Sequence, residues 1–381
     1  MSKKVVIVSN FHEDIDVSRS LKAFYYFKSK GFDVEVLYSD FSHSLKCFRN
    51  INLPNHKKIR TISYSSNISI RRVISHFIYT FKVLSFLRNK EIDIIYVIYP
   101  PNVLSLIILF GSRKIKKIIV DVIDLWPEAF MTKKRSIKNL ILSPVYFISS
   151  YFRYKSLSLA NACLTESDYF SRILEFHKFK LSRVLYLSKS ITENSSFNNI
   201  SDELSIAYLG NIGHVYDFDS LFVILSEVQK HRKVSLHIIG AGPLKEWLLE
   251  RLKIIGIQYR YYGSSFDEKF KKNTLSSCWF GFNGYKVGYD VALSYKTIDY
   301  LSFGIPLINS ALEDTVDFVD RDKIGFNFLS KDLNPIIKKL SKISLKDISL
   351  LKRNAYKTFE KKFSTSTYNN IMDNVLDGIN E

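Results

Sequence analysis

Short apolar runs rich in Val and Ile alternate along the chain with stretches of helical character and with turns that contain Gly. The first run, Lys4–Ser9, is followed by a polar loop, a predicted helix at Arg19–Lys30 that ends at Gly31, and a second run at Asp33–Tyr38. This order predicts a parallel α/β sheet with strands covered on both faces. Further strands are predicted in the first half at Ile92–Ile98, Lys117–Val122, Ala162–Leu164 and Val184–Leu187.

The same pattern starts again after a polar segment rich in Ser, Asn and Thr, where we place a linker at 191–204. Strands are then predicted at Ser205–Leu209, Ser235–Ile239, Tyr259–Tyr262, Cys278–Phe282, Pro306–Asn309 and Ile324–Phe328, with helices at Asp219–Lys230, Leu244–Ile254 and around Asp299–Phe303. The chain is therefore expected to be α/β, with two Rossmann-like domains facing across a cleft. The first domain covers 1–190 and the second 205–355, and a C-terminal helix at 356–381 is expected to pack back on the first domain.

Charge separates the two halves. The 381 residues include 55 Lys and Arg and 37 Asp and Glu, which gives a net charge of +18. Residues 1–190 contain 31 basic and 14 acidic side chains, so the first half carries +17 of this excess. Such a domain requires an acidic partner, and nucleic acid and an anionic membrane surface are the two obvious candidates.

Cysteine content and apolar run lengths limit the class of protein. Cys47, Cys163 and Cys278 are scattered, so neither a zinc site nor a disulfide framework is expected, and a reducing cytoplasm fits. The opening MSKKVVIVSN does not resemble a signal peptide, because the apolar run after the lysines is too short. No run of 18 apolar residues is present, so no membrane span is expected.

Two strands of the second half end in glycine turns, Leu209–Gly213 and Ile239–Pro243. Gly at a strand end lets the backbone approach a ligand, and the helix that follows favours a phosphate. Such turns also occur in α/β folds for packing reasons alone. Neither turn forms the G-x-G-x-x-G fingerprint, because Gly242 runs into Pro243, so a Rossmann-type cofactor enzyme is disfavoured.

The segment Ser294–Ile308 is the most specific in the chain. It places Lys296 at the start of a predicted helix, where the helix dipole disfavours a cation. A bound diphosphate would offset that cost. Asp299, one turn further on, could accept hydrogen bonds from ribose hydroxyls. The alternatives are a solvated lysine and a carboxylate that stabilises the first helical turn.

This segment resembles the donor-binding motif of GT-B glycosyltransferases, particularly family 4 and its bacterial polysaccharide-assembly relatives. Lys296, Tyr300, Gly304, Pro306 and Ile308 match the pattern, with Asp299 in place of the usual Glu. Four more segments resemble family motifs in the expected order, so the resemblance covers about residues 4–375. They are Asp121–Glu128, Ala160–Ser167, Tyr208–Gly213 and Leu236–Pro243.

The resemblance implies a donor site in the second domain. Gly210, Asn211 and Gly213 would lie along the diphosphate, and Gly240 and Gly242 would line the nucleotide side. Tyr262, Gly263 and Ser264 would hold the base. Ser294 and Tyr295 would flank Lys296, which would neutralise the leaving group, while Asp299 would contact the ribose.

The chain departs from the family pattern at two places. The first glutamate of the family's E-x7-E motif is Val291 here, and the adjacent Asp290 could serve instead. The Arg and Lys that follow the first glycine turn in many relatives are absent, with His214 and Tyr216 in that region. Phosphate binding would therefore depend on Lys296 and backbone amides. These departures also leave open a non-catalytic or regulatory GT-B protein.

Candidate acceptor residues lie in the first domain. Asp124 follows a predicted strand and is the candidate carboxylate: it would deprotonate the acceptor hydroxyl in an inverting enzyme and orient the acceptor in a retaining one. Its alternative role is to cap the next helix. Trp126 lies in the same motif, and His12 and Arg19 near the first strand are candidates for acceptor contacts. No Asp-x-Asp pair follows an apolar strand, so we predict neither a catalytic metal nor a cofactor.

The densest basic runs are at 113–117 and 133–138, and the second leads into the apolar segment Asn139–Tyr154. Arg71 and Arg72 begin another such segment, Val73–Leu87. This combination is typical of helices that lie on an anionic leaflet, although core-packing helices with solvated ends are an alternative. Nucleic acid is disfavoured, because no recognised binding motif is present. We therefore predict a cytoplasmic glycosyltransferase, peripheral on the inner membrane face, that transfers a sugar from a nucleotide diphosphate donor to a lipid-linked saccharide. It would act in capsule, O-antigen or exopolysaccharide biosynthesis, with retention and without a metal.

Overall fold

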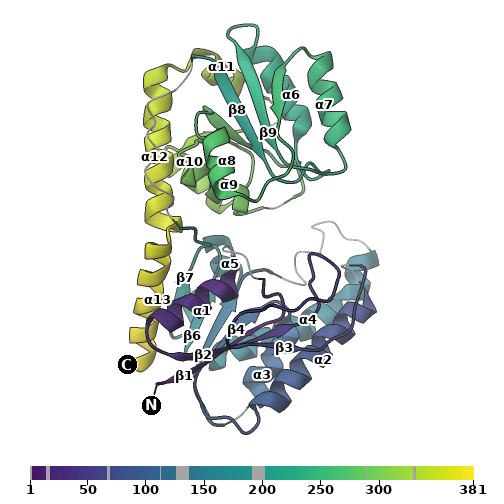
Figure 1. Ribbon diagram of the computed structural model, residues 1–381, viewed down its shortest axis with the longest axis vertical. Coiled ribbons are helices and arrows are strands. Elements are labelled where there is room, and N and C mark those ends of the chain that lie inside the picture. Colours follow the sequence, from purple (N-terminus) through teal and green to yellow (C-terminus); the bar gives the residue numbers. More distant parts are fainter. Residues whose placement is uncertain are drawn as a thin grey trace. The chain divides into compact units, whose positions relative to one another are not determined.

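The computed structural model describes residues 2–13, 18–66, 69–111, 113–125, 137–190, 202–289, 291–328 and 332–381. The chain divides into two compact units (Figure 1). Unit 1 comprises Met1–Leu187 together with Asn369–Glu381, and unit 2 comprises Ser188–Tyr368. The predicted linker lies mostly outside the described residues.

Unit 1 contains a parallel sheet of seven strands in the order β3-β2-β1-β4-β5-β6-β7. Its central strands are almost completely buried, because they consist mainly of Val and Ile and are covered on both faces. The strands are β1 (Lys4–Ser9), β2 (Asp33–Ser39), β3 (His56–Ile59), β4 (Ile92–Tyr99), β5 (Ile115–Val122), β6 (Ala162–Thr165) and β7 (Ser182–Val184).

Helices connect these strands and cover the sheet (Figure 1). Their buried side chains, such as Tyr79 and Val83, join the strand residues Val97 and Val120 in one core. The helices are α1 (Arg19–Ser29), α2 (Ile70–Leu87), α3 (Ser105–Phe110), α4 (Ile137–Leu159) and α5 (Asp168–Ile173), with short 3-10 turns at Asn102–Leu104 and Phe176–Lys178.

Unit 2 repeats the same winding with six parallel strands in the order β10-β9-β8-β11-β12-β13. Its strands are β8 (Leu204–Leu209), β9 (Val234–Ile239), β10 (Gln258–Tyr261), β11 (Phe280–Asn283), β12 (Leu307–Asn309) and β13 (Gly325–Asn327). Its helices are α6 (Phe218–Val228), α7 (Lys245–Ile254), α8 (Glu268–Leu275), α9 (Tyr295–Ser302), α10 (Asp314–Arg321), α11 (Asn334–Lys342) and α12 (Leu345–Phe363). In both sheets the first strand lies between the second and the fourth, so the order reverses there. Ligands of doubly wound folds bind beside this switch point.

The C-terminal segment contains α12 and then α13 (Thr365–Asn380). Most of α13 belongs to unit 1, whereas α12 belongs to unit 2. The Tyr26 hydroxyl donates a hydrogen bond to Asp373 at 2.6 Å, and Lys30 forms an ion pair with the same carboxylate. Gly378 lies against Leu181, so a side chain at this position would crowd that leucine. The chain therefore returns to its first unit after completing the second.

All the strands predicted from apolar runs except one are present, with ends that differ by at most two residues. One strand was not predicted, and one prediction needs correction. The short edge strand β3 was missed, because its sequence HKKI is polar and two of its residues are exposed. The strand expected at Val184–Leu187 is Ser182–Val184 instead, and the buried Leu185 and Leu187 belong to the segment that follows it.

Candidate functional site

Two glycine turns of unit 2 pack directly against each other. Gly210 follows β8 with φ +116°, and its amide donates a hydrogen bond to the Ile239 carbonyl at 2.9 Å. A Cβ atom on Gly240 would lie 1.9 Å from the Gly210 carbonyl oxygen, which no side chain can tolerate. Close backbone packing therefore requires glycine at 240, whatever ligand the turn binds.

The residues that follow Gly210 are held by the second turn. Gly242 has φ +158°, and a Cβ there would lie 2.3 Å from the Ile212 carbonyl oxygen. The Ile212 amide donates to the Ala241 carbonyl at 2.8 Å. A Cβ on Gly213 would meet the Asn211 amide nitrogen at 2.8 Å. The predicted donor residues of both turns thus form one continuous backbone surface at the carboxyl edge of the sheet.

Lys296 lies in the first turn of α9, beside this surface. Ser294 caps α9 by accepting a hydrogen bond from the Thr297 amide at 3.2 Å, which sets where the helix begins. Lys296 is only 6% exposed, and a Cβ on Gly210 would lie 3.6 Å from its Cε atom. Tyr295, its neighbour, is half exposed. The side chain of Lys296 therefore runs beneath the turn that follows β8.

Three tyrosines surround the Lys296 ammonium, and we call them the tyrosine cage. Its Nζ lies 3.8 Å from the ring centroid of Tyr216, 4.3 Å from that of Tyr208 and 5.8 Å from that of Tyr285. Within the described part of the chain, Nζ has no hydrogen-bond partner. Burial lowers the pKa of Lys296 well below its usual value. The site thus contains a buried lysine amine that no carboxylate of the described residues contacts.

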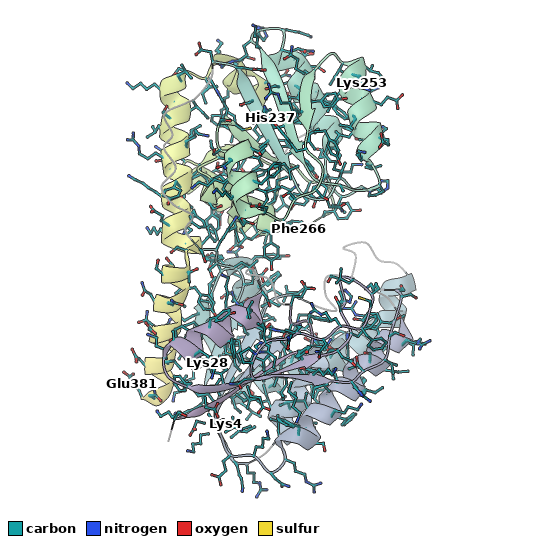
Figure 2. The ribbon with its side chains drawn as sticks, viewed as in Figure 1. Lys4, Lys28, His237, Lys253, Phe266 and Glu381 are labelled. Atoms are coloured by element: carbon teal, nitrogen blue, oxygen red, sulfur yellow. The ribbon has the colours of Figure 1, made fainter. Side chains whose placement is uncertain are left out.

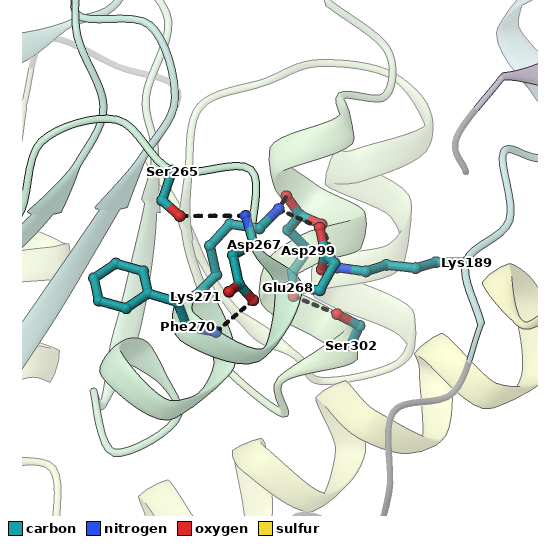
Figure 3. A network of polar contacts seen from close by, with 8 residues as sticks. All are labelled: Lys189, Ser265, Asp267, Glu268, Phe270, Lys271, Asp299 and Ser302. Atoms are coloured by element: carbon teal, nitrogen blue, oxygen red, sulfur yellow. Dashed lines mark hydrogen bonds and ion pairs between the residues drawn. The ribbon is translucent and has the colours of Figure 1, made fainter. Parts of the chain in front are cut away.

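Asp299, the predicted ribose ligand, lies in an ion-pair network instead (Figure 3). Its carboxylate oxygens accept from Lys189 at 2.6 Å and from Lys271 at 3.4 Å. Both lysines also form ion pairs with Glu268. Burial alone would raise the pKa of Glu268, but the hydrogen bonds from the two lysines lower it overall. A ribose at Asp299 would have to share this carboxylate with two cations.

The residues predicted to hold the base lie at the end of β10. The Tyr262 amide donates to the Ile238 carbonyl at 2.9 Å, and its hydroxyl is 3.0 Å from Nδ1 of His237. His237 lies on β9 (Figure 2). Gly263 has φ +75°, and its carbonyl accepts from the Gly240 amide at 2.8 Å. A Cβ on Gly263 would meet no atom within 4 Å, so this turn borders open space.

The buried guanidinium of Arg19 is bound by groups of its own unit. Arg19 is 4% exposed, and its guanidinium donates to both oxygens of Asp121 at 2.6 and 3.1 Å. It also donates to the Tyr186 carbonyl at 3.0 Å and to the Leu185 carbonyl. The acceptor contact predicted for Arg19 does not fit this placement. Arg19 connects α1 to β5 and to the end of the first sheet instead.

His12 is equally enclosed. Its Nδ1 lies 2.6 Å from the Ser20 hydroxyl, and its ring packs against Tyr38 and His56. Burial, assisted by the charges of His56 and Arg49, lowers the pKa of His12 to about 3. The side chain is 1% exposed, so a direct contact with an acceptor does not fit it either.

Two carboxylates follow neighbouring strands at the carboxyl edge of the first sheet. Asp124 comes after β5 and is exposed. Glu166 comes after β6, and burial raises its pKa to about 8, with Asp121 and Asp124 adding to the rise and Arg19 opposing it. Glu166 therefore holds its proton at neutral pH. Sequence reasoning missed it, since its pKa depends on charges from three other segments.

No protein-family model matches this chain, and no curated protein matches it by sequence. Solved structures match it over nearly its full length. Sucrose-phosphate synthase from Thermosynechococcus elongatus has a TM-score of 0.69 at 11% identity, covering 98% of both chains. HepE from Anabaena in complex with UDP has a TM-score of 0.67 at 12% identity, covering 98% of this chain and 99% of that one. The lipopolysaccharide outer core galactosyltransferase WaaB has a TM-score of 0.64 at 15% identity, with the same coverage.

The chain has the GT-B fold. The fold class expected from the ordered motifs is thereby confirmed. Sequence reasoning noted Tyr216 only as a departure from the family pattern. It did not predict that Tyr208 and Tyr285 lie against the Lys296 ammonium, and it missed Lys189 and Lys271, the two lysines that bind Asp299.

Two predicted site residues of this GT-B chain, Trp126 and Asp290, lie outside the described residues. In the part that is described, no group of three His, Cys, Asp or Glu side chains is placed to bind a metal. Asp217, from one of the Asp-x-Asp pairs, caps α6 by accepting from the Ser220 amide at 3.1 Å. Among the described helices, none has the length and apolar character needed to cross a bilayer.

Proposed function

We propose that this chain is a glycosyltransferase that moves a sugar from a nucleotide diphosphate donor to a hydroxyl of a lipid-linked saccharide. The observation that carries the proposal is the buried Lys296 beside the glycine turns of the unit 2 switch point, whose ammonium has no partner among the described residues. A buried cation without a counter-charge is costly, and a bound diphosphate would remove that cost. The solved relatives support the donor class: HepE is described in complex with UDP-glucose, and TarM from S. aureus with UDP.

During transfer, the diphosphate leaving group is the part of the substrate that most needs electrostatic stabilisation. As the bond between the sugar and the diphosphate breaks, negative charge grows on the leaving oxygens. In this proposal Lys296 neutralises that charge together with backbone amides of the Gly210–Gly213 turn, without a metal ion. We propose Ser294 and Tyr295 as flanking donor contacts and Tyr262 with Gly263 as the base-binding edge. Asp299 would contact the ribose by sharing its carboxylate with Lys189 and Lys271.

On the acceptor side we propose Asp124, because it is an exposed carboxylate after a central strand of unit 1. It would orient the acceptor hydroxyl during transfer with retention, or take its proton in an inverting reaction. Glu166, protonated near neutral pH, could donate a hydrogen bond beside it. Asp290 and Trp126 remain part of the proposed site on the family resemblance alone.

A lipid-linked acceptor is held in a membrane, so we propose that unit 1 binds an anionic membrane surface. The segments α2, α3 and α4 contain no Asp or Glu, and they present exposed apolar side chains that include Phe77, Phe81 and Ile148. A cavity of about 240 Å³ lies between them, lined mainly by Val73, Phe77, Val103, Leu106, Ile148 and Phe152. Apolar side chains beside basic ones suit the boundary between lipid headgroups and acyl chains. Such an enzyme would serve capsule, O-antigen or exopolysaccharide assembly.

A thermal-shift panel tests the donor class. UDP, GDP, TDP, CMP and NAD are added separately to the purified protein. We expect one nucleoside diphosphate to raise Tm, because a ligand that binds only the folded state stabilises it. A rise with NAD alone would favour a dinucleotide enzyme, and no rise with any diphosphate would contradict the proposal.

Sedimentation with vesicles tests the membrane surface. The protein should bind vesicles that contain anionic lipid and should dissociate as salt rises, because screening weakens attraction between exposed charges. Phe77→Ser with Phe81→Ser should reduce binding to anionic vesicles, while Tyr25→Ser, an exposed change on α1, should not. Binding to neutral vesicles at the same level, or none to either, would contradict the proposed surface.

A further inference from the structure

The tyrosine cage is assembled from three separate segments of unit 2. Tyr208 lies in β8, Tyr216 in the loop before α6, and Tyr285 just after β11. The backbones of Tyr216 and Tyr285 form an antiparallel bridge, and the Lys286 amide donates to the Val215 carbonyl at 3.0 Å. The Tyr208 and Tyr216 rings are 5.9 Å apart, and those of Tyr216 and Tyr285 are 5.2 Å apart. Backbone pairing therefore fixes the cage before any ligand arrives.

The cage stabilises a cation without neutralising it. The face of an aromatic ring attracts an ammonium through its quadrupole, and this attraction grows when water is excluded. A carboxylate in the same place would also stabilise Lys296, but it would compete with the diphosphate for the cation. Nζ forms no ion pair with a described residue, and the nearby Asp299 is engaged by Lys189 and Lys271.

We propose that the tyrosine cage is a positioning device for diphosphate recognition: it holds the Lys296 ammonium in place without a counter-ion until the diphosphate supplies one. This inference rests on the proposed function, since it assigns a role to residues around the proposed diphosphate ligand. It accounts for the composition of the loop, because no Lys or Arg occurs between Gly210 and Lys230. A single well-oriented cation would replace several mobile ones.

Ring faces and burial act on Lys296 in opposite directions. Burial lowers the pKa of Lys296, whereas the ring faces favour its charged form. Among the described residues, the titratable groups that face the ammonium are the phenols of Tyr208, Tyr216 and Tyr285. Burial raises the pKa of each of them, so they are neutral at physiological pH and supply ring faces only. Loss of a ring should therefore lower the pKa of Lys296 further.

The first experiment measures the affinities of UDP and uridine by calorimetry in three proteins. Tyr216→Leu, which removes the ring closest to Nζ, should weaken UDP binding about 10-fold, the equivalent of about 1.4 kcal/mol. Uridine binding should not change, since uridine carries no phosphate. Tyr216→Phe retains the ring and should restore most of the UDP affinity. Equal loss for UDP and uridine, or equal loss in the Leu and Phe variants, would overturn the proposal.

A double-mutant cycle separates positioning from general structure. In a Lys296→Met background, Tyr216→Leu should have little further effect on UDP affinity, because the cation that the ring positions is gone. An undiminished effect in that background would show that Tyr216 acts independently of Lys296. The control Tyr25→Leu, in unit 1, should not change UDP affinity in either background.

A measurement without any ligand keeps the cage testable if UDP does not bind. The Lys296 side-chain NMR signal, assigned by its loss in Lys296→Met, is titrated with pH in the free proteins. Tyr216→Leu should move its midpoint to lower pH, and Tyr216→Phe should leave it near the wild-type value. An unchanged or higher midpoint in the Leu variant would overturn the cage. Failure of all nucleoside diphosphates to bind the wild type would contradict the proposed function instead.

Discussion

In each unit of this protein a buried cation lies in the first turn of a helix, Arg19 in unit 1 and Lys296 in unit 2, and these two cations have opposite surroundings. Arg19 in α1 is bound by both oxygens of Asp121 and by two backbone carbonyls. Lys296 in α9 lies against the tyrosine cage with no hydrogen-bond partner in the described part of the chain. Neither cation is favoured by its helix dipole, so each needs a stabilising partner.

The difference distinguishes a structural cation from a ligand-binding one. Arg19 forms an ion pair with the fully buried Asp121, so the charge of Arg19 is neutralised within the fold. The charge of Lys296 is not used by any described carboxylate and remains available to an anion. Both residues are basic and both lie at the start of a helix, so the sequence alone did not distinguish their roles. Sequence reasoning therefore predicted substrate contacts for both.

The largest effect that would test this comparison is expected at Arg19. Arg19→Met should lower the free energy of unfolding by about 3–5 kcal/mol, because it leaves the Asp121 carboxylate buried and unpaired. Denaturant unfolding measures the change. Arg19→Met combined with Asp121→Leu should recover much of the loss, since it removes both charges. If Arg19→Met alone lowers the free energy of unfolding by less than about 1 kcal/mol, this ion pair contributes no more than an exposed surface pair does, and the structural role of Arg19 is contradicted.

Lys296→Met should have the opposite effect on stability. It removes a buried ammonium that has no hydrogen-bond partner among the described residues, so the free energy of unfolding should rise by about 1–2 kcal/mol. UDP should still raise Tm, but by less than in the wild type, because its affinity is lower. The pKa of Lys296 is lowered in the folded protein, so the gain is present at neutral pH and disappears at strongly alkaline pH. Destabilisation at neutral pH would indicate that Lys296 is structural, like Arg19.

A smaller effect is expected for a buried histidine of unit 1. Burial, helped by Arg72 and His43, lowers the pKa of His76 to about 3. Its folded pKa lies below its unfolded value, so stability is lost as pH falls below about 6.5, by about 1 kcal/mol between pH 7 and 5.5. His76→Gln should remove that share of the pH dependence of unfolding, whereas the exposed His231→Gln should not. Equal slopes in both variants would contradict the assignment.

The fold was largely predictable because the chain repeats a strongly local signal. Short apolar runs that end at a turn residue can be recognised in the sequence wherever a strand is buried on both faces, as in β1, β4 and β8. The edge strand β3 was not, because its polar residues carry no such pattern. The site was partly predictable: the position of Lys296 at a helix start and the absence of basic residues after Gly210 were both visible in the sequence.

The sequence by itself determined the α/β winding, the ordered motifs of a GT-B fold and the residue types at the switch point, because these depend on spacing along the chain. Only the tertiary structure decided which cation is free. Asp121 lies 102 positions from Arg19, and Lys189 lies 110 positions from Asp299, so the pairings arise from contacts between distant strands and helices. The charge state and availability of a buried group depend on all its neighbours, and spacing along the chain does not specify them.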